Sequence, residues 1–290
     1  MAKRDVDIVV ISDVHLGTYG CRSKELLKYM KSINPKKVIL NGDIIDIWQF
    51  SKRYWPKSHM KVIKHIMKWI SNGIEVHYIT GNHDEMLRKF VGFELGSFSI
   101  INKLLLDLDD KKAWFFHGDV FDVTMQHSKW IAKLGAVGYD SLILLNSAIN
   151  FFTVKFGGSP ISMSKKIKNS VKSAVKFINN FEKIAADIAI ENQYDYVVCG
   201  HIHQPEMREI KNNDSSVMYL NSGDWIENLT SLEYNNKQWR IYSYEEDSAL
   251  NKKLDKNIED DFEEEELLEN KAIFLNLMKE FQFENAIKKK

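Results

Sequence analysis

The stretch VDIVVISDVHLG, residues 6–17, joins a run of β-branched apolar residues to a polar turn that ends in glycine. Such a run is typical of a buried strand. Five later stretches have the same form: KKVILNGDIID (36–46), EVHYITGNHDE (75–85), KAWFFHGDVFD (112–122), YDYVVCGHIHQPE (194–206) and SVMYLNSGDW (216–225). Between the early ones, apolar residues recur at helical spacing over 22–33 and 62–70. Strand, helix and strand in succession predict a parallel α/β sheet, whose functional groups gather beyond the carboxyl ends of the strands.

The composition indicates a globular protein without a disulfide framework. The 290 residues are 44% hydrophobic and 28% charged, and 40 basic residues are balanced by 40 acidic ones. Zero net charge gives no sign of a nucleic-acid partner, and two cysteines point to a reduced, cytoplasmic setting. The first apolar run is too short for a signal peptide, and no later one reaches the ~20 residues of a spanning helix. We expect a protein that is not integral to a membrane, although it could rest on one.

The chain changes character twice after the fourth of these stretches. Residues 122–194 show helical apolar spacing and no strand pattern, which predicts a helical insertion over the functional edge of the sheet. The final strand pair is expected to turn at Asn235 and Asn236, and beyond it the chain is dense in charge. These features predict one domain over 1–245, including the insertion, and a charged tail over 246–290.

The polar turns hold the residues that carry chemistry. Their candidate side chains are Asp13, His15, Asp43, Asp46, Asn82, His83, His117, His201 and His203. Taken singly, a histidine at a strand end is usually a hydrogen-bonded surface or core residue. Taken together, these groups offer only oxygen and nitrogen ligands, and more of them than a single catalytic zinc ion uses. They suffice for two ions that share a bridging carboxylate, an arrangement suited to phosphoryl transfer, and we therefore predict a dinuclear metal site.

The order of these motifs resembles that of the calcineurin-like metallophosphoesterases. The family pattern runs D-x-H, G-D-x-x-D, G-N-H-D/E, a histidine before a small residue, and G-H-x-H, and every block is present here in that order. The resemblance implies a four-layer α/β/β/α sandwich, an α/β fold of two facing sheets with helices outside and a helical lid insertion. It also implies the ligand sets, namely Asp13, His15 and His203 for one ion, Asn82, His117 and His201 for the other, and Asp43 bridging both. By the same resemblance, His83 would donate a proton to the leaving oxygen and Asp46 would orient it.

From about residue 6 to 245 the chain is similar to a narrower bacterial group, the UDP-2,3-diacylglucosamine pyrophosphatases. That likeness implies that water cleaves the pyrophosphate of UDP-2,3-diacylglucosamine, giving UMP and the lipid 1-phosphate of lipid A biosynthesis. One position departs from the group, because its best-known members carry arginine where this chain has His83. Arginine cannot donate a proton at neutral pH, and an alkoxide leaving group needs an acid more than a phosphate does. A calcineurin-like phosphodiesterase or phosphatase acting on another lipid or nucleotide ester therefore stays open.

Two other classes compete with these hydrolases. Zero net charge and the lack of a long basic groove signature count against a nuclease on the same fold. A non-catalytic scaffold would tend to lose metal ligands, and none is replaced here. The expected cofactors are two divalent cations, manganese first, with iron and zinc as alternatives.

The expected partner is a lipid-linked nucleotide or another phosphoester, and no nucleic acid is expected. Peripheral attachment to the inner face of the inner membrane stays open. Candidate substrate contacts are Arg53, Arg88 and Lys172, for which surface ion pairing is the alternative interpretation. Asn221 and Asp224 end a strand near the site and could shape its rim without binding metal. Four histidines, His59, His65, His77 and His127, lie outside the motifs. His65 and His77 are expected to serve packing or the surface, and so is His127, although it could approach the site from the insertion.

Overall fold

The computed structural model describes residues 3–47, 55–121, 164–212 and 215–247. The chain divides into two compact units, Met1–Ser243 and Tyr244–Lys290, and the strands and helices named below belong to the first unit. Residues 122–163 of the predicted insertion, and the predicted tail beyond residue 247, lie outside the described residues. The predicted division of the chain into domain, insertion and tail therefore stays a prediction.

One sheet is built around the parallel strands that the sequence predicts. Its strand order is β12-β11-β1-β2-β3-β5-β4. The strands are β1 (Arg4–Ile11), β2 (Ile33–Asn41), β3 (Glu75–Ile79), β4 (Glu94–Leu95), β5 (Phe98–Ile101), β11 (Thr230–Asn235) and β12 (Gln238–Ser243). β1, β2, β3 and β5 run parallel, while β4, β11 and β12 pair antiparallel at the edges. Each strand of the central pairs thus ends at the same edge as its neighbour.

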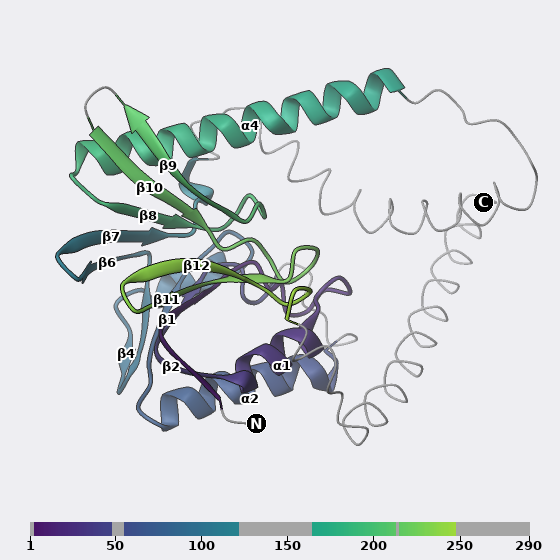
Figure 1. The fold of residues 1–290 in the computed structure, drawn as a ribbon. Coiled ribbons are helices and arrows are strands. Elements are labelled where there is room, and N and C mark those ends of the chain that lie inside the picture. Colours follow the sequence, from purple (N-terminus) through teal and green to yellow (C-terminus); the bar gives the residue numbers. More distant parts are fainter. Residues whose placement is uncertain (1–2, 48–54, 122–163, 213–214, 248–290) are drawn as a thin grey trace, which may run out of the picture. The chain divides into compact units, whose positions relative to one another are not determined.

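Two helices connect the first three strands and cover one face of this sheet. They are α1 (Ser23–Ser32) and α2 (Lys57–Ser71), which lie side by side in Figure 1. Leu26 and Met30 of α1 are buried, as are Val62 and Ile66 of α2, because their spacing places them on one helix face. Ile33, counted in the helical stripe of the first segment, is instead the first residue of β2.

The second sheet has the order β6-β7-β8-β10-β9. Its strands are β6 (Lys103–Leu108), β7 (Lys111–Phe116), β8 (Tyr196–Cys199), β9 (Glu206–Asn212) and β10 (Ser215–Asn221). β7, β8 and β10 are parallel, and the edge strands β6 and β9 are antiparallel to their neighbours. Helix α4 (Ser164–Glu191) lies along the outer face of this sheet (Figure 1), where Phe181, Ala185 and Ala189 pack against Val197 and Tyr219.

The main hydrophobic core lies between the two sheets. The first sheet contributes Ile8, Val10 and Ile39, and the second contributes Phe115 and Val198, all of them buried in one cluster. Burying each such side chain contributes about 1.5–3 kcal/mol before the entropy cost of ordering the chain. With α1 and α2 outside one sheet and α4 outside the other, the layers are helix, sheet, sheet and helix. This arrangement confirms the expected α/β sandwich.

Two local features differ from the sequence-based expectations. Strands β4, β5, β6 and β9 were not anticipated, because β4 and β5 are only two and four residues long and β6 and β9 carry charged residues among their apolar ones. The last hairpin turns at Asn236 and Lys237 rather than at Asn235 and Asn236, since Asn235 pairs with Gln238. Both turn residues have positive φ, 50° and 63°, as a two-residue turn between twisted strands requires. Among the helices that the structure describes, none is long and apolar enough to cross a membrane.

Candidate metal centre

The predicted ligands all follow the carboxyl ends of strands, and both sheets supply them. Asp13 and His15 follow β1, Asp43 follows β2, Asn82 and His83 follow β3, His117 follows β7, and His201 and His203 follow β8. The strands that carry them are parallel within each sheet, and the two sheets face one another. Their polar turns therefore meet at one edge of the sandwich.

An unusual backbone conformation aims these side chains inward. Positive φ angles are rare for residues other than glycine and cost about 1–2 kcal/mol each. Five of the predicted ligands adopt them: Asp13 (52°), His15 (54°), Asp43 (54°), His201 (68°) and His203 (55°). Strand β8 ends at Cys199, so the two histidines of GHIH are not held to the alternation of a strand. Such strain is retained where the surrounding structure requires one particular direction of a side chain.

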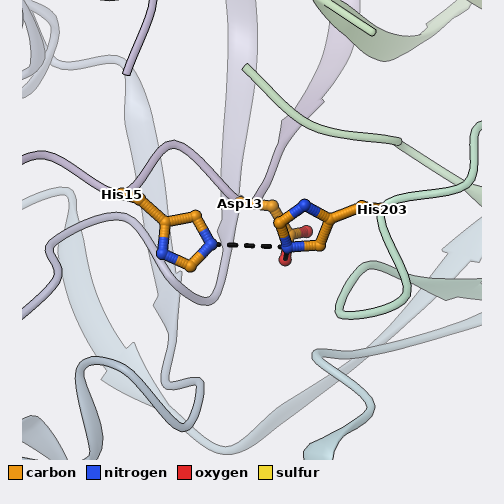
Figure 2. Close-up of side chains that lie close together, drawn as sticks. All are labelled: Asp13, His15 and His203. Atoms are coloured by element: carbon orange, nitrogen blue, oxygen red, sulfur yellow. Dashed lines mark hydrogen bonds and ion pairs between the residues drawn. The ribbon is translucent and has the colours of Figure 1, made fainter. Parts of the chain in front are cut away.

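One group of ligand atoms joins the turn after β1 to the turn after β8. Figure 2 shows Asp13, His15 and His203 converging from these two segments. Nε2 of His203 lies 3.2 Å from Oδ1 of Asp13 and 3.4 Å from Nε2 of His15. Asp13 is fully buried, and both of its oxygens accept the backbone N–H of His201, at 3.2 and 3.1 Å. The carboxylate is therefore fixed in place by the second sheet.

A second group forms around Asp43. Nε2 of His117 lies 3.2 Å from Oδ2 of Asp43, and the rings of His117 and His201 are in edge contact, with centroids 5.2 Å apart. Nδ1 of His117 lies 2.8 Å from the carbonyl oxygen of Asn41, which can only accept. Nδ1 therefore carries the proton, and Nε2 presents a lone pair to the group, which is the tautomer that a metal ligand needs.

Asp43 lies in contact with the turn that holds Asn82. The backbone N–H of His83 donates to Oδ1 of Asp43 at 2.8 Å. A Cβ added to Gly81 would collide with that same oxygen, so the turn approaches the carboxylate as only glycine allows. Asn82 stands between these two contacts and is half-buried. The structure thus brings all seven predicted ligands to one edge, Asn82 by its place in the turn and the other six as two groups of facing atoms. A third set of facing atoms, from His15, Asp43 and His83, overlaps both groups.

The donor atoms have the spacing and the charge of ion ligands. Two ligands bound at about 2.1 Å to a tetrahedral or octahedral ion lie about 3.0–3.4 Å apart. The separations of His203 from Asp13 and His15, and of His117 from Asp43, fall in this range. Nε2 of His117 is buried and makes no hydrogen bond within the described structure. Burial alone would raise the pKa of Asp43, but the imidazoles of His117 and His15 outweigh it and hold that pKa well below its usual value. The residues therefore fit a divalent cation in each group.

His83 and Asp46 form a pair beside these groups. Nδ1 of His83 lies 2.9 Å from Oδ2 of Asp46, a carboxylate that is almost fully buried. The ring of His83 stands at 84° to that of His15, with centroids 4.6 Å apart. Burial by itself lowers the pKa of His83, but the carboxylates Asp46 and Asp43 raise it by more, so that the net shift of the pKa is upward. A partly exposed imidazole held in this way keeps its other nitrogen available to a reacting group.

The candidate substrate contacts are placed less directly. Arg88 forms an ion pair with Asp119, which follows His117 and Gly118, so its charge is engaged at the margin of the site. Arg53 and the side chain of Lys172 lie outside the described residues, as does His127. Among the other histidines, His65 packs on Trp69, His77 pairs with Glu75 and Ser99, and His59 accepts the backbone N–H of Gly17 at 3.0 Å.

Asp84 is a further residue of the site to which the motif analysis assigned no role. It is fully buried, and its Oδ2 accepts the hydroxyl of Tyr78 at 2.6 Å and the backbone N–H of Ile44 at 3.0 Å. Its Oδ1 accepts the backbone N–H of Gly81. One carboxylate therefore ties the turn after β2 to the turn after β3. Its position directly after the candidate residues of GNHD was the signal available in the sequence.

Residues 6–205 match the family model of the calcineurin-like phosphoesterases, a span that contains all the motifs of the site. The chain belongs to this family. It is accordingly a hydrolase of the phosphoesterase superfamily, whose members use divalent metal ions, and the predicted family is confirmed.

Curated relatives are similar to this chain over most of their own length. The UDP-2,3-diacylglucosamine hydrolase of Blochmanniella pennsylvanica is 24% identical over 248 residues, covering 80% of this chain and 93% of its own length. That of Aliivibrio fischeri is 21% identical, covering 82% and 98%. Among solved structures, a novel archaeal phosphodiesterase has a TM-score of 0.38 at 16% identity, covering 81% of this chain and 98% of its own. The nuclease MPE of Pseudomonas putida has a TM-score of 0.33 at 12% identity, with 81% and 87% covered.

Proposed function

We propose that this phosphoesterase hydrolyses the pyrophosphate of UDP-2,3-diacylglucosamine to UMP and the lipid 1-phosphate. The observation that carries the proposal is the match to hydrolases of that name over 93% and 98% of their length. All seven ligand positions predicted from the motifs lie together at one edge of the fold, which supports catalysis over a non-catalytic scaffold. A diacylated substrate implies that the enzyme works at the inner face of the inner membrane.

Two divalent cations are part of this proposal, with manganese first and iron or zinc as alternatives. Asp13, His15 and His203 would hold one ion, Asn82, His117 and His201 the other, and Asp43 both. When bound, the pair would supply positive charge to the phosphoryl oxygens and acidify water. Asp13 and Asp43 are buried and rigidly held, so the site needs little rearrangement to receive the reacting phosphate.

His83 is the proton donor in this proposal. Asp46 fixes Nδ1 of the ring at 2.9 Å, which leaves Nε2 to protonate the leaving oxygen. A pyrophosphate loses a phosphate, which is a good leaving group and needs this proton little. The His83–Asp46 pair therefore favours a second candidate, hydrolysis of a lipid or nucleotide phosphoester whose leaving group is an alkoxide. Both candidates use the same ligands and differ in the leaving group.

Turnover of the purified, Mn²⁺-loaded protein on UDP-2,3-diacylglucosamine tests the proposal. Nitrophenyl phosphomonoester, nitrophenyl phosphodiester and single-stranded DNA are assayed beside it, with chelator-treated protein as the control. Release of UMP that stops on chelation is the expected result. Diester cleavage without UMP release would reject the lipid pyrophosphatase in favour of the second candidate, and cleavage of DNA alone would reject both.

A further inference from the structure

The turn after β10 places a buried carboxylate behind one of the predicted metal ligands. Asp224 is fully buried, and its Oδ2 lies 3.3 Å from Nδ1 of His203. The other nitrogen of this ring, Nε2, is the one that faces Oδ1 of Asp13 at 3.2 Å. The imidazole therefore stands between two carboxylates, one inside the proposed metal group and one outside it.

Asp224 is held in place without help from His203. Its Oδ1 accepts three consecutive backbone N–H groups, those of Ile226 (2.9 Å), Glu227 (2.7 Å) and Asn228 (3.0 Å). The side-chain amide of Asn228 donates to Oδ2 at 2.9 Å and also to the carbonyl oxygen of His203 at 2.8 Å. The carboxylate is thus a fixed acceptor, and Asn228 locks it to the backbone of the histidine that it faces.

Among the ligand imidazoles His15, His117 and His203, the last has the most exposed side chain. Its side chain is 35% exposed, whereas those of His15 and His117 are 6% and 1% exposed. Packing therefore restricts the ring of His203 less than it restricts those of His15 and His117. Nδ1 of His117 meets a neutral carbonyl, that of Asn41, while Nδ1 of His203 meets a negative charge. A charged acceptor holds an N–H group more strongly and raises the basicity of the opposite nitrogen.

We infer that Asp224 is a positioning residue, which holds the Nδ1–H of His203 and so presents the Nε2 lone pair to the cation bound by Asp13 and His15. This inference rests on the metal centre of the proposed function. It assigns the segment NSGDW (221–225) to that centre, although none of its side chains belongs to the predicted ligand set.

The substitution Asp224→Asn tests the inference with little change in shape. The amide oxygen still accepts the three backbone N–H groups, but the amide NH₂ then faces Nδ1 of His203 and the side-chain amide of Asn228, both of which lie beside Oδ2 of Asp224. A donor opposite that nitrogen favours the tautomer with the proton on Nε2, which cannot bind a cation. In calorimetric titration, we expect the affinity for one of the two Mn²⁺ ions to fall about 10–100-fold and the affinity for the other to stay unchanged. Glu233→Gln, which alters a buried carboxylate away from the site, should leave both affinities unchanged.

A double-mutant cycle with His203→Gln separates positioning from a general structural role. If Asp224 acts through His203, adding Asp224→Asn to the His203→Gln variant should lower the affinity for the affected ion by less than a further factor of about two. A further loss as large as in the wild-type background would overturn the inference, and so would normal binding of both ions by Asp224→Asn alone. Wild-type protein that binds fewer than two ions would instead overturn the proposed metal centre itself, and the inference with it.

Discussion

At the scale of single residues, Asp43 is the position on which the two metal groups depend. It faces His117 at 3.2 Å and His15 at 3.9 Å, and these imidazoles belong to different groups. Asp43→Ala should therefore lower the affinity for both cations and reduce kcat by at least about a thousandfold, because charge stabilisation at both is lost. Metal content by mass spectrometry and turnover of a nitrophenyl ester check this. Near-normal values of both would contradict a bridging role.

His83 carries a prediction about the leaving group. His83→Gln removes the ionisable donor but keeps a polar side chain of similar length beside Asp46. We expect kcat to fall about 100-fold for esters with alkoxide leaving groups and by less than about tenfold for nitrophenyl esters or a pyrophosphate. Asp46→Asn is the matched control and should show the same dependence on the leaving-group pKa in a weaker form. An equal loss for all substrates would show that His83 is not the acid.

At the scale of elements, Asp84 couples the turns that follow β2 and β3. Its two oxygens bind Ile44, Gly81 and Tyr78. Asp84→Leu would leave these buried donors without acceptors, and we expect it to lower the free energy of unfolding by about 2–4 kcal/mol and to weaken metal binding. Tyr78→Phe removes only one of the three donors and should cost about 1 kcal/mol. Denaturant unfolding of the metal-free proteins measures both. Equal stability of the two variants would mean that the turns do not depend on Asp84.

The elements also show which parts of the fold follow from local sequence. The strands that bear the ligands are largely buried towards their carboxyl ends, so β1, β2, β3, β7 and β8 are rich in apolar residues there, which predicts them well. β6 is exposed at alternate positions, but its sequence KLLLDL does not alternate between apolar and polar residues, so the strand was not apparent from the sequence. The ligand types were predictable because each motif places polar residues after a strand. Their convergence depends on positive φ angles and on the facing of two sheets, which no local pattern encodes.

At the scale of the whole molecule, a buried charge cluster makes stability depend on pH. Glu233 on β11 is fully buried and binds Arg4 on β1, Arg240 on β12 and Tyr29 on α1. Burial raises the pKa of Glu233, but the two arginines lower it more, so its folded-state pKa lies below that of an ordinary glutamate. A carboxyl group with a depressed folded pKa contributes stability above its unfolded pKa and loses it as the pH falls.

Glu233→Gln should therefore lower the free energy of unfolding by about 1–3 kcal/mol at pH 7 and by less below the ordinary glutamate pKa of about 4.3. Two arginines would remain beside an amide, but both are partly exposed and can be hydrated. Thermal unfolding of wild type and variant from neutral pH down through that pKa measures the difference. If the difference in free energy of unfolding between wild type and variant stayed constant over this pH range, the charge of Glu233 would not have the assigned role.

The metal centre should also stabilise the sandwich as a whole, because its ligands come from opposite sheets. Asp13, His15 and Asp43 belong to the first sheet, and His117 and His203 to the second, so each ion would cross-link the two layers of the core. A ligand at about 100 times its Kd stabilises the folded state by about 2.7 kcal/mol, which corresponds to about 5–10 °C in Tm for a domain of this size. Chelation should therefore lower Tm by at least that amount, and readdition of Mn²⁺ should restore it. Asp43→Ala, which lowers the affinity for both ions, should have the lower Tm from the start and show no further shift on chelation. If the chelator lowered the Tm of variant and wild type equally, the stabilising ion would lie elsewhere.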